Sequence, residues 1–132
     1  MNDDFTFSIR IISDDSDFIN IIPEMSGYKI TYHKKGDNLT KNRVIKSKAN
    51  VLVIHDFYKC SCIDETNNSI ILSKLLPIMK TLSIIKTNDI KRELYITGKI
   101  ENQQFGFNFD TNILNLLNKN EYSLSFSGVS YL

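Results

Sequence analysis

The 132-residue chain carries 16 lysine and arginine side chains against 15 aspartates and glutamates, a formal charge of +1. This near balance argues against a dedicated nucleic-acid binder, whose affinity depends on neutralising many phosphates. Hydrophobic residues make up 42% of the chain and charged residues 23%, which is ordinary globular usage and argues against disorder. No apolar run approaches the roughly 18 residues of a membrane span. The length fits a single domain over residues 1–132.

The N-terminus and the cysteines indicate a cytoplasmic protein. Residues 1–4 are acidic and lack the basic and apolar regions of a signal peptide. Cys60 and Cys62 cannot form a disulfide framework, and one intervening residue on an extended segment gives poor geometry for a bridge between them. We therefore expect reduced thiols in a cytoplasmic setting.

The first half of the chain predicts three strands and one short helix, from alternation and helical spacing of the apolar residues. In chain order these are a strand at 5–11, a helix at 18–22, a strand at 28–32, a loop or edge ribbon at 38–50 and a strand at 51–58. Asp14, Asp15 and Ser16 would begin the helix and Pro23 would end it. One face of the third strand would carry Val51, Val53, His55 and Phe57.

The second half predicts a helix at 71–82, a strand at 94–100 with its hairpin partner at 105–109, a helix at 113–117 and a strand at 122–131. Ser69 is expected to cap the first of these helices, and Pro77 to kink or split it because proline lacks an N–H. Asp110 or Thr111 would cap the second, and Gly128 would mark a bulge. The order β-α-β-β-α-β-β-α-β predicts an α+β fold, a mainly antiparallel sheet with helices on one face.

Local motifs for catalysis or metal binding are missing from the sequence. Cys60-Ser61-Cys62 has no second ligand pair for zinc, and Lys34-Lys35-Gly36-Asp37 lacks the spacing of a phosphate loop. His55 and Asp56 are adjacent, so on a regular strand they would face opposite sides and share no site. We therefore predict no catalytic residue, no metal site and no cofactor.

The acidic cluster of Asp14, Asp15 and Asp17 lacks the further ligands and the glycine of a calcium loop. Negative charge before a helix is favourable through the helix dipole, and this structural reading is preferred.

Charge is distributed unevenly along the chain. Residues 1–28 hold six acidic side chains and one arginine, whereas residues 29–48 hold seven basic side chains and one aspartate. Opposite patches of this kind can steer an association, although a solvated ribbon, partly balanced by the acidic first segment, is the preferred interpretation of the basic segment. If the segment binds a partner, the candidate residues are Lys34, Lys35, Asp37, Lys41 and Arg43.

The order of several short motifs resembles the bacterial domain of unknown function 4279. The motifs are the strand at 5–11, the turn from Tyr32 to Asp37, Leu75-Leu76 followed by the strand at 94–100, and Phe107-Asn108-Phe109-Asp110 leading through Leu114, Leu116 and Leu117 to a strand ending at Tyr131. The family's tryptophan in the middle strand and its acidic residue near the final tyrosine have no counterpart in Val51–Val53 and Ser127–Ser130. The resemblance implies an α+β domain without established activity, of the kind found as immunity proteins beside bacterial toxins.

Three classes of function follow. The first is a non-catalytic protein-binding domain, either an immunity-type inhibitor of a toxin or a phage or mobile-element protein that antagonises a defence system. The second is an enzyme or small-ligand-binding domain whose site is assembled from residues far apart in sequence. The third is nucleic-acid binding through residues 29–48, which the overall charge disfavours. The C-terminal strand, with no charged residue after Glu121, is also a candidate edge for a homodimer.

Overall fold

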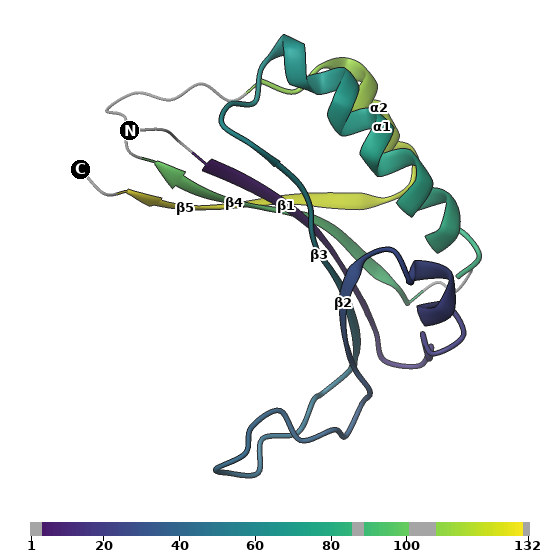
Figure 1. The fold of residues 1–132 in the computed structure, drawn as a ribbon. Helices are drawn as coiled ribbons and strands as arrows, with labels where there is room; N and C mark the ends of the chain where they lie inside the picture. Colours follow the sequence, from purple (N-terminus) through teal and green to yellow (C-terminus); the bar gives the residue numbers. More distant parts are fainter. Residues whose placement is uncertain (1–3, 86–88, 101–107, 131–132) are drawn as a thin grey trace.

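The computed structural model describes residues 4–85, 89–100 and 108–130 and contains one five-stranded sheet with two α-helices on one face (Figure 1). In chain order the elements are β1 (Asp4–Ser13), the 3-10 helix η1 (Ile22–Met25), β2 (Lys29–His33), β3 (Asn50–Cys60), α1 (Glu65–Leu82), β4 (Lys91–Ile100), α2 (Thr111–Lys119) and β5 (Tyr122–Ser130). No helix among these residues is long and apolar enough to cross a membrane.

The strands lie in the order β2-β3-β1-β4-β5. β1 pairs with β3 and β4 and β2 pairs with β3, all antiparallel, whereas β5 runs parallel to β4. The parallel pair requires a crossover connection, which contains α2. The predicted α+β class with a mainly antiparallel sheet is confirmed.

The core lies between the sheet and the helices. Period-two alternation buries Phe5, Phe7, Ile9 and Ile11 of β1 beneath the helices, as expected of a half-buried strand. The buried side chains of α1 include Ile71, Leu75, Ile78, Met79 and Leu82, which follow helical spacing. The opposite face of the sheet has no helix on it among the described residues (Figure 1).

The predicted helix at 18–22 is wrong. The chain forms turns there, and the 3-10 helix η1 starts at Ile22 with Pro23 in its first turn, a position where the missing N–H costs nothing. The carboxylate of Asp17 accepts a hydrogen bond from the backbone of Ile19 at 2.9 Å, so this side chain stabilises a local turn.

The predicted cap of α1 is wrong, and of the two outcomes expected at Pro77, a kink or a split, the split does not occur. The N-cap is Asp64, five residues before the expected cap Ser69, and its side chain accepts a hydrogen bond from the backbone of Thr66. Pro77 does not split the helix, which continues from Glu65 to Leu82. Because the apolar positions before and after the proline face the same core, their burial favours one helix despite the lost hydrogen bond.

Two further predictions concern strands near the C-terminus, the bulge at Gly128 and the hairpin strand at 105–109. The register of β4 and β5 is unbroken from Arg92 and Tyr122 onward, so the bulge predicted at Gly128 is wrong. Gly128 lies opposite Gly98, and neither strand has an extra residue at this position. The predicted hairpin strand at 105–109 falls mostly outside the described residues; Phe109 lies outside any strand, its ring centroid 6.3 Å from that of Phe7.

Candidate binding face and arm

The uncovered face of the sheet, called here the open face, is polar. Side chains that are cross-strand partners share a face, so the register defines three rows across it. They are Thr31–Val53–Arg10–Glu93–Ser123, then Lys29–His55 and Ser8–Tyr95–Ser125 on either side of a register shift in the β1–β3 pair, and Lys59–Thr6–Thr97–Ser127. Cations predominate on this face. They are Arg10 and four lysines, Lys29, Lys59, Lys91 and Lys99, against Asp4, Asp56 and Glu93.

A bulge in β3 shapes the middle of the open face. Residues 55–57 lie opposite Ser8 alone, because Ile9 pairs with Ile54 and Phe7 with Tyr58. Asp56 takes φ of +52°, a region that aspartate tolerates better than most residues, and its backbone N–H donates to the Ser8 hydroxyl at 3.0 Å. The bulge thus breaks the alternation on which the strand prediction rested.

The expectation that His55 and Asp56 cannot share a site is therefore wrong. Both line one hollow of about 390 Å³, together with Ser8, Arg10, Val53, Tyr95 and Thr97. The His55 ring nitrogen Nε2 lies 2.8 Å from the Thr31 hydroxyl. Phe57, predicted to share a face with His55, packs against the core instead, with its ring 6.2 Å from that of Phe7.

A polar network fixes the centre of the open face. Arg10 Nη2 lies 3.1 Å from Glu93 Oε1, and the Ser125 hydroxyl donates to Glu93 Oε2 at 2.9 Å. Glu93 Oε1 is buried and accepts no well-directed hydrogen bond from the described residues, so its contact with Arg10 is chiefly coulombic. The three side chains span β1, β4 and β5 and hold the face in one arrangement.

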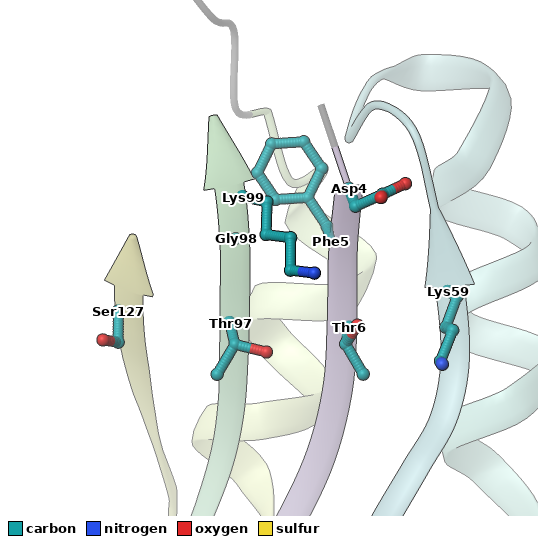
Figure 2. A pocket seen from close by; sticks show the side chains of 8 residues that line it. All are labelled: Asp4, Phe5, Thr6, Lys59, Thr97, Gly98, Lys99 and Ser127. Atoms are coloured by element: carbon teal, nitrogen blue, oxygen red, sulfur yellow. The ribbon is translucent and has the colours of Figure 1, made fainter. Parts of the chain in front are cut away.

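A second hollow, of about 350 Å³, lies at the end of the open face and is shown in Figure 2. Its lining residues come from the neighbouring strands β3, β1, β4 and β5, and the helices lie behind these strands in Figure 2. Its lining includes three hydroxyl-bearing side chains and two lysines, Thr6, Thr97 and Ser127 with Lys59 and Lys99. Asp4 also borders this hollow, so the lysines are its predominant but not its sole charges.

An arm, residues 34–49, connects β2 to β3 and extends away from the sheet and the helices (Figure 1). Backbone hydrogen bonds tie its two limbs together. Gly36 donates to Ser47 at 2.9 Å, Ser47 to Asp37 at 2.8 Å, and Leu39 to Ile45 at 2.7 Å. The arm is therefore an ordered loop that is preorganised to present its tip.

The tip of the arm combines exposed aliphatic and basic side chains. Val44 is 76% exposed, and Leu39 and Ile45 are also among the exposed large hydrophobics. Lys41 and Arg43 lie between them in the chain and are exposed too. The Thr40 hydroxyl donates to the backbone oxygen of Arg43 and closes the loop at this point.

Among the sequence-predicted partner residues, Asp37 has a structural role. Its carboxylate accepts a hydrogen bond from the Lys34 backbone at 2.8 Å, and Gly36 next to it takes φ of +94°, which favours glycine. The Lys35 backbone donates to the Asn50 side chain at 2.8 Å. The side chains of Lys34, Lys35, Lys41 and Arg43 are exposed along the arm.

The acidic segment at residues 14–17 meets the base of the arm. The Tyr32 hydroxyl donates to the carboxylate of Asp17, and Lys34 Nζ lies 3.9 Å from the same group. The hydrogen bond from Tyr32 lowers the pKa of Asp17. Burial, and then the bond to Asp17, raises the pKa of Tyr32 to about 12. Thus Asp17 anchors the arm.

The two cysteines lie at the end of β3 and beyond it. Burial raises the pKa of Cys60 to about 11. Cys62 is exposed, and its thiol donates to Asp64 Oδ2 at 3.3 Å, a bond that raises the pKa of Cys62. Within residues 4–85, 89–100 and 108–130, no group of three or more His, Cys, Asp and Glu side chains could hold a metal ion.

The sequence did not predict the open face as one surface. Its serines and threonines are individually unremarkable, and only the strand order places them side by side. The alternation of Thr6, Ser8 and Arg10 with buried residues was the one available signal, because it predicted a polar face for β1.

No family model, no curated protein and no solved structure matches this chain.

Proposed function

We propose that the chain is a non-catalytic domain that binds an acidic protein through its arm and the adjoining open face, as an immunity-type inhibitor binds a toxin. The observation that carries the proposal is the tip of the arm, where exposed Val44 stands among Lys41, Arg43 and Lys46 on a hydrogen-bonded loop. An apolar anchor surrounded by charges has the composition of a binding hot spot with a polar rim.

Charge supports a partner with an acidic surface. The arm carries six basic side chains, Lys34, Lys35, Lys41, Arg43, Lys46 and Lys48, against Asp37. Lysines also predominate among the charges of the open face. Complementary charge accelerates encounter and selects the partner, while the aliphatic tip supplies burial.

A protein partner is favoured over a nucleic acid. Glu93 lies in the middle of the open face and Asp56 borders its central hollow, where either would oppose a phosphate backbone. Three exposed aliphatic side chains, Leu39, Val44 and Ile45, offer apolar area that phosphates cannot use.

The test is a differential capture from nuclease-treated lysate of the source cell. The wild-type chain is compared with the arm variant Lys41→Glu/Arg43→Glu/Val44→Asp and with the control Lys74→Glu/Lys80→Glu, which also reverses two basic charges, on exposed positions of α1. We expect one protein to be retained by wild type and control and lost with the arm variant. Co-expression of that protein should inhibit growth, and the wild-type chain should restore it.

Retention by all three baits, or by none, would contradict the arm as the binding element. Retention of nucleic acid in untreated lysate, lost steeply with added salt, would support nucleic-acid binding instead. A retained defence component that does not inhibit growth would support the anti-defence alternative.

A second candidate, a small-ligand site, rests on the hollow that the β3 bulge creates beside His55 and Asp56. Its volume of about 390 Å³ lies within the range of small-molecule sites. Neither cysteine lines it. Screening a metabolite library by ligand-observed NMR tests this candidate, with His55→Ala as the matched variant; hits that bind both proteins equally would remove it.

A further inference from the structure

β5 forms one edge of the described sheet, away from the arm. β5 is the last strand of the sheet, and β4 is its one strand neighbour among the described residues. β2, which leads into the arm, lies at the opposite edge. The outer backbone N–H and C=O groups of an edge strand are a template for pairing with another strand.

The usual protections of an edge strand are missing from β5. Its sequence from Tyr122 to Ser130 contains no lysine, no other charged residue and no proline. Its register with β4 runs from Tyr122 to Ser130 without a bulge. Natural sheets use short strands, charges, proline or bulges to prevent edge-to-edge association, and this edge has none of these along its length.

Leu124 and Phe126 of β5 are each 39% exposed. Their partners in β4 are Leu94 and Ile96, both fully buried, so the two residues lie on the helix-covered face where that cover ends. Apolar residues at this place leave part of the core layer incomplete at the edge. A neighbouring strand with apolar residues in the same alternation would complete it.

We propose that a second copy of this chain pairs with β5 in antiparallel orientation, joining two five-stranded sheets into one. Centred on Ser125, this two-fold pairing places Leu124 of one copy opposite Phe126 of the other, twice, on the helix-covered face. An uncharged strand meets its own copy without repulsion, whereas a charged partner strand would gain nothing from it. The two arms then lie at opposite ends of the joined sheet, each accessible to its own partner.

The test measures molar mass by light scattering after size exclusion, from low to high micromolar concentration. The wild-type chain should approach twice its 15.2 kDa mass as concentration rises. Leu124→Glu and Leu124→Lys should each remain monomeric, because like charges then meet across the two-fold axis at a diagonal distance of about 7–8 Å. The control Leu76→Glu, on a leucine of α1 that is 46% exposed, should dimerise like wild type.

An equimolar mixture of Leu124→Glu and Leu124→Lys should recover the dimer, a result that loss of folding in either variant cannot produce. Amide hydrogen exchange of the wild-type chain provides a measurement without substitution: protection along β5 should rise with concentration. A wild-type chain that stays monomeric throughout, or a dimer that both Leu124 variants retain, would overturn the proposal. Concentration-independent exchange in β5 would overturn it as well.

Discussion

Asn68 of α1 accepts a hydrogen bond at 3.0 Å from the backbone N–H of Asp110, the residue that caps α2. The Asn68 amide nitrogen also donates to the backbone oxygens of Asp64 at 2.6 Å and Asn108 at 2.9 Å. The side chain is 2% exposed, so it joins the starts of both helices from a buried position.

Asn68→Ala should therefore lower the free energy of unfolding by about 2–3 kcal/mol, because it leaves buried backbone groups without partners. Urea denaturation followed by circular dichroism measures the change. The control Asn115→Ala, at an exposed position of α2, should change stability by less than about 0.5 kcal/mol. Equal effects of the two substitutions would contradict the linking role of Asn68.

Gly98 gives a second stability prediction. A β-carbon there would lie 3.1 Å from the rings of both Phe5 and Phe126, whose centroids are 6.2 Å apart. Gly98→Ala should cost about 1–3 kcal/mol through overpacking. Gly27→Ala, where a β-carbon would meet nothing within 4 Å, is the matched control and should be neutral or slightly stabilising. A neutral Gly98→Ala would show that the two rings can move apart.

The sequence predicted the strands better than it predicted the features between them. Residues Phe5–Ile11 alternate and Ile71–Leu82 follow helical spacing because one side of each element is buried. One-sided burial leaves a periodic pattern that can be seen in the sequence. The cap at Asp110 was also predicted correctly, because its chemistry is local.

The misses depend on contacts between residues that lie apart in the chain, which a one-dimensional pattern does not contain. The bulge at Asp56 depends on a hydrogen bond to Ser8, 48 positions earlier in the chain. The turn at Asp17 depends on Tyr32 of another strand. The open face depends on the strand order, which no periodicity encodes; the sequence showed the polar side of β1 and the basic character of the arm, but not the surface that the strands form together.

Cys62 provides a prediction about reactivity. Its hydrogen bond to Asp64 raises its pKa, so little thiolate forms near neutral pH and alkylation should be slow. Asp64→Asn removes the negative charge but keeps an N-cap side chain of equal quality for α1. Alkylation of Cys62 by iodoacetamide, followed by mass spectrometry at neutral pH, should therefore be several-fold faster in Asp64→Asn. The more buried Cys60 is the internal reference: burial is the first cause of its raised pKa and the charge of Asp64 the last, so its rate should change much less than that of Cys62. Unchanged Cys62 kinetics would contradict the role of Asp64.

The bond between Tyr32 and Asp17 predicts a loss of stability in acid. The folded-state pKa of Asp17 is lower than its ordinary value of 3.8, so the unfolded chain takes up this proton first. The contribution of Asp17 is fully present above 3.8 and is lost as the pH falls through the folded-state pKa. Tyr32→Phe should flatten this part of the stability curve in urea titrations. A curve parallel to that of wild type would contradict the assignment.

The same bond predicts a loss of stability in alkali, where the unfolded chain releases the Tyr32 proton at a lower pH than the folded chain does. Tyr32 ionises at about 12 in the folded chain against 10.0 ordinarily, so between these values the unfolded chain releases the proton first and stability falls as pH rises. Burial gives Tyr122 a pKa of about 12 as well, and that contribution remains in both proteins. The difference between wild type and Tyr32→Phe therefore isolates Tyr32.

Asp17→Asn should reproduce part of this difference, because burial is the first cause of the raised Tyr32 pKa and the bond to Asp17 is the second. If Tyr32→Phe loses stability as steeply as wild type between pH 10 and 12, the hydroxyl does not anchor the arm in solution.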